Sequence, residues 1–263
     1  MLAATAEHDH RIAAVLLDYW EQSRRPLISL VFILPLLVVY EAGVLLLGPQ
    51  AVRNGADVWL RQLLEGLGFA ESLQYFMLPV ATIGLLLGWH HLTHRPWTIS
   101  RGVLFWMFAE CGALAILLIG LAHLQGTLLQ QLGWQIPRAT VESAMQASVT
   151  DGSKTLLGRI VGYFGAGIYE EVLFRLVLLA TLWAMFRGWF GSNKGPAILA
   201  VIFSSAIFSA AHYIGPHGEP FAVYTFLFRF FAGSFFAVLF VLRGFGVAAG
   251  THAGYDILVG LMY

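Results

Sequence analysis

Long apolar stretches alternate with short polar ones along almost the whole chain. A membrane-spanning helix needs about 20 consecutive apolar residues, and by that measure seven stretches are candidate spans. They are approximately residues 27–47, 73–92, 103–123, 156–186, 197–213, 221–242 and 245–263. The pattern predicts an all-α fold, a multi-pass transmembrane helical bundle of about seven to eight spans.

Two shorter segments have the pattern of helices that lie along a membrane surface. Between the first two stretches, residues 52–67 place apolar side chains at helical spacing among charged ones such as Asp57 and Arg61. A second amphipathic piece covers residues 12–20. We therefore expect interfacial helices at both places. The longest polar connection, residues 125–155, contains turn-forming residues but no pattern that assigns it a role.

The composition agrees with a membrane protein and excludes some functions. The chain is 58% hydrophobic and only 11% charged, whereas soluble domains are about 45–50% apolar. Fifteen basic and fifteen acidic side chains balance, so there is no general attraction to nucleic acid. The single cysteine, Cys111, excludes an internal disulfide framework. The first apolar stretch is longer than the roughly 7–15 apolar residues of a secretory signal, which predicts a retained span.

Three ionisable side chains interrupt the fourth stretch, at Glu170, Glu171 and Arg175. A charged side chain at the bilayer centre costs at least ~2.5 kcal/mol, so such residues need partners and indicate a functional site. Residues four apart in a helix share a face, so Glu171 and Arg175 are predicted to form an ion pair with the acid before the base. Adjacent side chains diverge by about 100°, which points Glu170 elsewhere and leaves its carboxylate available for chemistry.

Two later stretches carry paired residues with the same spacing. Phe208 and His212 lie four apart in the fifth stretch, and His252 and Asp256 lie four apart in the seventh. Each pair projects from one helical face. Together with Glu170, the two histidines predict a site that is assembled from three helices and in which a buried carboxylate and imidazoles take part in proton transfer.

Small residues predict how the last helix packs. They recur at Gly246, Gly250 and Gly254, nearly opposite the side that carries His252. Small residues let helix backbones approach closely in a membrane. The last helix is therefore expected to have a packing side and a polar side.

The three paired motifs, taken in order, resemble a known family. They are similar to the motifs of the CPBP family, with Glu170-Glu171-x-x-x-Arg175, then Phe208-x-x-x-His212, then His252-x-x-x-Asp256. This family comprises CAAX prenyl endopeptidases and bacteriocin-processing (Abi) enzymes, which are glutamic-type intramembrane proteases. The resemblance covers roughly residues 156–263, which are expected to form a catalytic core of four spans. Residues 1–155 are expected to hold the amphipathic N-terminal segment and the first three spans.

The resemblance implies metal-independent hydrolysis of a peptide bond within the membrane. By similarity, Glu170 is the general base that takes a proton from water, and His212 helps to hold and activate that water. His252 and Asp256 stabilise the oxyanion that forms on the scissile carbonyl, a task that requires hydrogen-bond donors. An ionised aspartate only accepts hydrogen bonds, so Asp256 is either protonated or orients His252 and fixes its tautomer.

The same resemblance gives the supporting residues and the partners. Glu171 and Arg175 would support the site, and Phe208 would pack beneath it. No cofactor and no metal are implied. The expected partners are the lipid bilayer and a peptide or membrane-anchored protein substrate, without nucleic acid, while the oligomeric state is not indicated. We expect a multi-pass protein of the cell membrane, in particular of a prokaryotic inner membrane.

Two other functions fit part of the pattern. Histidines and carboxylates also bind zinc in hydrolases, but the sequence has no H-E-x-x-H pair and the ligands would come from three separate helices. Intramembrane charges also line transport paths, so a non-proteolytic family member that acts as a membrane scaffold, an immunity protein or a carrier is the alternative. Against a carrier, the sequence shows no inverted repeat in two halves.

Overall fold

The protein is helical throughout the parts of the chain that the structure describes. The computed structural model describes residues 17–134, 155–191, 194–215 and 218–262, and these ranges contain no strand. The helices are α2 Pro26–Leu47, α3 Pro49–Val52, α4 Gly55–Gly66, α5 Glu71–Leu92, α6 Arg101–Gln131, α8 Leu156–Gly165, η1 Ala166–Glu170, η2 Val172–Leu179, α9 Ala180–Phe190, α10 Gly195–Ala211, α11 Val223–Arg243 and α12 Phe245–Met262. The predicted all-α helical bundle is therefore confirmed. Most of the amphipathic piece at 12–20 and of the connection at 125–155 lies outside the described residues.

Within the described ranges, five helices are long and apolar enough to cross a membrane. They are Pro26–Leu47, Leu73–Leu92, Arg101–Gln131, Leu156–Phe190 and Val223–Arg243. The other two predicted spans are helices as well, but α10 has only 17 residues, and polar residues and glycines lower the hydropathy of the 18-residue α12. The chain is a multi-pass membrane protein, and the number of seven to eight crossings stays a prediction.

The fourth predicted span is one continuous helix that changes its winding near its middle. The ordinary α-helical segments α8 and α9 form its ends, and the π-helical segments η1 and η2 lie between them. A π-helix has wider turns, is rare, and is found mostly at functional sites. The sequence predicted an overlong span here but not the change in winding.

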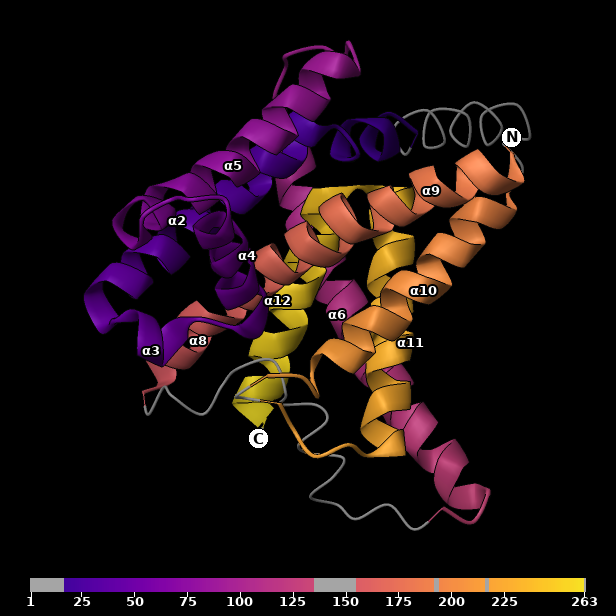
Figure 1. Ribbon diagram of the computed structural model, residues 1–263. Helices are drawn as coiled ribbons and strands as arrows, with labels where there is room; N and C mark the ends of the chain where they lie inside the picture. The colour runs from indigo at the N-terminus through magenta and orange to yellow at the C-terminus, as the bar shows by residue number, and fades with distance from the viewer. Residues whose placement is uncertain (1–16, 135–154, 192–193, 216–217, 263) are drawn as a thin grey trace, which may run out of the picture.

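Helix α12 lies in the middle of the bundle (Figure 1) and packs against α2, α6, α8, α11 and η1. A Cβ atom added at Gly246 would lie 2.8 Å from the Cα atom of Ser29 in α2. One added at Gly250 would lie 2.9 Å from the Sγ atom of Cys111 in α6. The predicted packing side of this helix is confirmed, because side chains at these glycines would push α2 and α6 away.

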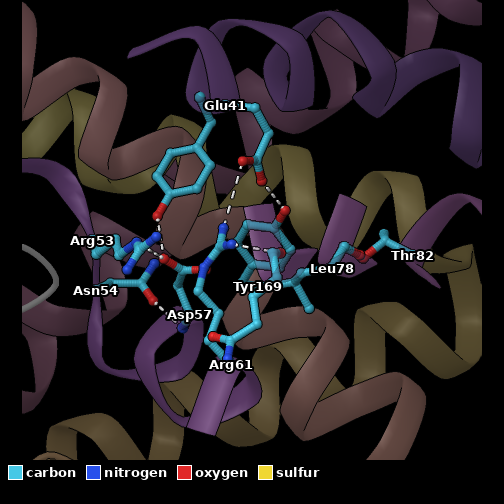
Figure 2. A network of polar contacts seen from close by, with 10 residues as sticks. Glu41, Arg53, Asn54, Asp57, Arg61, Leu78, Thr82 and Tyr169 are labelled. Carbon is cyan, nitrogen blue, oxygen red and sulfur yellow. Dashed lines mark hydrogen bonds and ion pairs between the residues drawn. The ribbon is translucent and has the colours of Figure 1, made fainter. Parts of the chain in front are cut away.

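The polar side of α4 faces inward, whereas a helix on a membrane surface normally turns its polar side to water. Asp57 is fully buried and Arg61 is 3% exposed, whereas Leu63 is 59% exposed. Arg61 Nε donates to Asp57 Oδ1 at 2.7 Å, and Arg61 Nη2 lies 3.5 Å from Glu41 Oε2 in α2. Glu41 in turn accepts a hydrogen bond from the hydroxyl of Tyr169 in η1 (Figure 2). The helical rhythm of this segment is confirmed, and its charged residues connect α2, α4 and η1.

Candidate active site

The π-helical turn places an ion pair at the centre of the site. Arg175 Nε lies 3.1 Å from Glu171 Oε2, and both side chains are buried. Arg175 Nη2 also donates to the backbone carbonyl of Gly233 in α11 at 3.2 Å. The guanidinium carbon of Arg175 lies 4.6 Å from the centre of the Phe208 ring. The predicted pair is therefore present, and it joins η2 to α10 and α11.

His252 from α12 is held on one side and faces two carboxylates on the other. Its Nδ1 lies 2.8 Å from Glu171 Oε1, and because a carboxylate accepts, Nδ1 is the donor in this bond. Its Nε2 lies 3.8 Å from Glu170 Oε2 and 3.7 Å from Asp256 Oδ2, distances too long for a direct hydrogen bond. The imidazole also stacks on Phe236, with ring centres 4.4 Å apart. The ring is thus fixed in orientation, with Nε2 pointing between the two carboxylates.

Glu170 is buried without the partners that neutralise the adjacent glutamate. Its side chain is only 6% exposed, and within the described ranges its Oε2 has no hydrogen-bond partner. The buried Arg229 of α11 does not neutralise it, because Arg229 pairs with Glu219 at 2.7 Å. The Glu170 carboxylate therefore remains available toward His252.

His212 lies beside this group but is not bonded to it. It is the residue that ends α10, and its Nδ1 lies 2.9 Å from the backbone carbonyl of Phe208. A carbonyl only accepts, so Nδ1 carries the proton and Nε2 is left as an acceptor when the ring is neutral. The Phe208 ring lies between the two imidazoles, 5.0 Å from His212 and 6.3 Å from His252. Among the described residues no hydrogen bond or ion pair joins His212 to Glu170.

A close contact between backbones sets the position of Glu170 relative to His252. A Cβ atom added at Gly167 in η1 would lie 2.7 Å from the Ala253 backbone nitrogen and 2.8 Å from the Ala249 carbonyl oxygen of α12. Real Cβ atoms essentially never come so close, so only glycine allows η1 to touch α12 here. This contact brings together the two segments that carry the carboxylate and the imidazole.

Some residues of the site were not singled out in the sequence. Phe236 supports the His252 ring, Gly233 accepts from Arg175, and Tyr169 ties η1 to Glu41. Gly233 and Phe236 are three apart and lie on one helical face, but apolar and small residues at such a spacing are common in any buried helix. Their role is visible only when the partner helix is known.

The arrangement can hold a small polar molecule between an acid and an imidazole. Two atoms 3.8 Å apart, such as Glu170 Oε2 and His252 Nε2, can each form a hydrogen bond of about 2.8 Å to one oxygen that lies beside both. Asp256 Oδ2 borders the same space at 3.7 Å from Nε2. Among the described residues, no group of three or more His, Cys, Asp or Glu side chains is arranged to hold a metal ion.

The comparison with known protein families concerns the segment that carries these residues. Residues 152–258 match the model of the family described as type II CAAX prenyl endopeptidase Rce1-like. This segment is similar to that family. The Rce1-like segment includes Glu170, His212, His252 and Asp256, and the match supports CAAX-protease-type intramembrane proteolysis at the level of the family. No curated protein and no solved structure matches the chain.

Proposed function

We propose that the protein is an intramembrane endopeptidase in which Glu170 activates water for attack on a peptide bond. The observation that carries this proposal is the buried Glu170 carboxylate, whose Oε2 has no hydrogen-bond partner in the described parts of the chain and faces His252 Nε2 at 3.8 Å. A general base must be within reach of its proton, either directly or through one water. The Rce1-like match of the surrounding segment supports the reaction class.

In the proposed reaction, a water oxygen attacks the carbonyl carbon while Glu170 accepts a proton from that water. The carbonyl oxygen becomes an oxyanion, and the carbon–nitrogen bond then breaks as the proton passes from Glu170 to the leaving amine. The acceptor nitrogen of His212 is suited to hold the attacking water, because the Nδ1 proton of His212 is occupied by the Phe208 carbonyl. The water would therefore lie on the side of the site nearest the end of α10.

The oxyanion would be stabilised by donors from α12. His252 Nδ1 is occupied by Glu171 at 2.8 Å, so Nε2 is the ring atom that can donate into the site when it carries a proton. Asp256 lies beside it and donates only in its protonated form. Removing one such donor from an enzyme typically lowers kcat by about 10²–10³.

The proposed substrate is the peptide part of a membrane-anchored protein, with CAAX-type prenylated ends as the first candidates because of the family match. Such substrates would reach the site from the bilayer. We further propose that no metal takes part, because Glu170 and His252 together supply a base and a donor.

The test is cleavage by the purified, vesicle-reconstituted protein. A prenylated CAAX-type peptide and other membrane-anchored peptides would be incubated with it, and the products identified by mass spectrometry. Glu170→Gln should lower kcat by about 10²–10⁴, the usual contribution of a general base. The control is Glu65→Gln, since Glu65 is exposed on α4.

Three results would contradict the proposal. Equal cleavage by the Glu170→Gln variant would remove the glutamate from the chemistry. Loss of activity in chelator, restored by zinc, would support the zinc protease instead. If no peptide is cleaved, the result would favour a non-proteolytic role as a membrane scaffold, an immunity protein or a carrier.

A further inference from the structure

One face of α11 lines the site at Gly233 and Phe236. Phe236 stacks on His252, and the Gly233 carbonyl accepts from Arg175. Arg229 is four residues before Gly233 and seven before Phe236, so it lies on the same face, about two turns toward the start of α11. The site therefore continues from the His252 ring along α11 to a guanidinium group.

Arg229 is a buried cation with few partners. Its side chain is 3% exposed, its Nη2 donates to Glu219 at 2.7 Å, and its Nε and Nη1 have no hydrogen-bond partner among the described residues. A guanidinium has five N–H donors, and buried charges are normally paired and hydrogen-bonded on all sides. Arg229 therefore retains the capacity to bind an anion.

Two other buried arginines show what a purely structural role looks like in this protein. All three side-chain nitrogens of Arg61 have hydrogen-bond acceptors. All three nitrogens of Arg243 have them as well, with Glu110 bound in a two-pronged manner at 2.6 and 2.7 Å. Arg229 differs from both because, among the described residues, only its Nη2 has a hydrogen-bond acceptor.

The one partner of Arg229 leads back to the site. Glu219 follows α10 in the chain, and its side chain is 32% exposed. Its backbone N–H donates to the carbonyl of His212 at 3.0 Å, and the guanidinium carbon of Arg229 lies 5.3 Å from the ring centre of Tyr213, the next residue along. Through Glu219, Arg229 is thus linked to the end of α10 beside His212. Its Nε and Nη1 have no hydrogen-bond partner among the described residues.

We propose that Arg229 binds a carboxylate group of the peptide substrate and thereby determines which peptides are cleaved. This inference rests on the proposed endopeptidase function. Seven residues of helix correspond to about 10 Å along α11 between the level of His252 and that of Arg229. An extended peptide rises about 3.3 Å per residue, so the carboxylate lies roughly three residues from the scissile bond. It is either the carboxylate at the end of the peptide or that of an acidic side chain.

The test compares matched peptides with the reconstituted enzyme. One cleaved peptide would be prepared with a free C-terminal carboxylate, as the C-terminal amide, and with each acidic side chain replaced by its amide. A charge-assisted hydrogen bond to a carboxylate corresponds to about ten- to a hundredfold in binding. For wild-type protein, we expect kcat/KM for one carboxylate-bearing peptide to exceed that for its amide by about ten- to a hundredfold. Most of this difference should be a lower KM for the carboxylate.

Arg229→Gln should reduce this ratio to about one, whereas Arg187→Gln, which changes an arginine on α9 beside Trp183, should leave it unchanged. Where Arg229→Gln does not insert stably, Arg229→Lys takes its place, and the ratio should fall because lysine lacks the rigid, planar set of donors that a guanidinium presents to a carboxylate. The role of Arg229 would be overturned if the enzyme showed no preference for any carboxylate, or if the preference persisted in both Arg229→Gln and Arg229→Lys. Either result would leave the endopeptidase function unaffected. Absence of cleavage of every peptide would instead contradict the endopeptidase function itself.

Discussion

Glu170 and Glu171 are adjacent in the sequence but have different surroundings. Glu171 is bound by Arg175 at 3.1 Å and by His252 at 2.8 Å. Glu170 instead faces the imidazole of His252, with Oε2 3.8 Å from Nε2. The Glu171 carboxylate therefore holds two helices together, whereas the Glu170 carboxylate is held in position by the residues around it.

The same isosteric change should have different effects on stability at these two positions. Glu171→Gln leaves Arg175 buried without its counter-charge, and breaking a buried pair in this way costs about 3–5 kcal/mol. Glu170→Gln removes a buried carboxylate whose Oε2 has no hydrogen-bond partner among the described residues, so the stability should stay the same or rise. Thermal unfolding of both variants in one detergent measures the difference, and an equal loss at both positions would disprove this division of roles.

Asp256 is the residue for which the structure narrows a choice that the sequence left open. Its orienting role would require a bond to His252, but the Nε2–Oδ2 distance is 3.7 Å, and the orientation of the ring is already fixed by Glu171 at 2.8 Å. Between the two roles we therefore propose the donor role, with a protonated Asp256.

Asp256→Asn should accordingly retain activity within about tenfold, because an amide donates as a protonated acid does. A carboxyl group donates only while it is protonated, so in the donor role the activity of the wild-type protein should fall as the pH rises. The Asn variant should lack this fall, and Asp256→Ala should lose activity at every pH. An Asn variant that is inactive across the whole pH–rate profile would contradict the donor role.

At the scale of elements, the π-helical turn and Gly167 determine how η1 meets α12. Since the backbone of α12 lies within 2.8 Å of where a Cβ at Gly167 would be, any larger residue must separate the two segments. That separation would move Glu170 away from His252.

Gly167→Ala should therefore reduce both stability and turnover. Overpacking of this kind costs about 1–3 kcal/mol, and a displacement of about 1 Å at a reacting group lowers the rate about 10²-fold. Gly188→Ala in α9 is the matched control, because a Cβ there would meet no atom within 4 Å. Melting temperature and cleavage rate are the measurements, and equal behaviour of the two variants would contradict the steric argument.

The positions of the helices were predictable from the sequence. The type of helix, α or π, and the side that each helix turns to its neighbours were only partly predictable. A run of apolar residues specifies a helix in a membrane because backbone hydrogen bonds must be satisfied within the segment. The same run does not distinguish α from π winding in η1 and η2. The sequence also could not show that Asp57 points inward, because this direction depends on Glu41 and Tyr169 from other helices.

For the site, the spacing of four residues correctly indicated the contact between Glu171 and Arg175. It also placed His252 and Asp256 on one face. It could not show that Glu171 also binds His252, because the distance between two helices is not encoded in a repeat within one of them. The catalytic assignments themselves stay predictions.

At the scale of the whole molecule, the two halves of the chain are packed into each other. Helix α12 from the second half lies against α2 and α6 from the first half, with Gly246 beside Ser29 and Gly250 beside Cys111. The polar network of α2 and α4 also reaches Tyr169 in η1 (Figure 2). The first 155 residues thus contribute directly to the position of the catalytic segments.

Residues 156–263 expressed alone are therefore expected not to form a stable protein. Co-expression of residues 1–155 with residues 156–263 should restore a complex that purifies together and cleaves substrate, because the contacts of α12 form between the pieces. Size-exclusion chromatography and the cleavage assay check both statements. A stable and active fragment 156–263 would show that the first half is dispensable.

The short length of α10 has a consequence for the lipid around the protein. Seventeen residues at 1.5 Å each give about 25 Å, whereas the hydrocarbon layer is about 30 Å thick. A helix that starts at one surface therefore ends short of the other, and lipid beside it adapts to such a mismatch by thinning. Because α10 ends at Ala211, next to His212, the bilayer would be thinnest beside the candidate site, where the proposed function requires water and a polar peptide to enter.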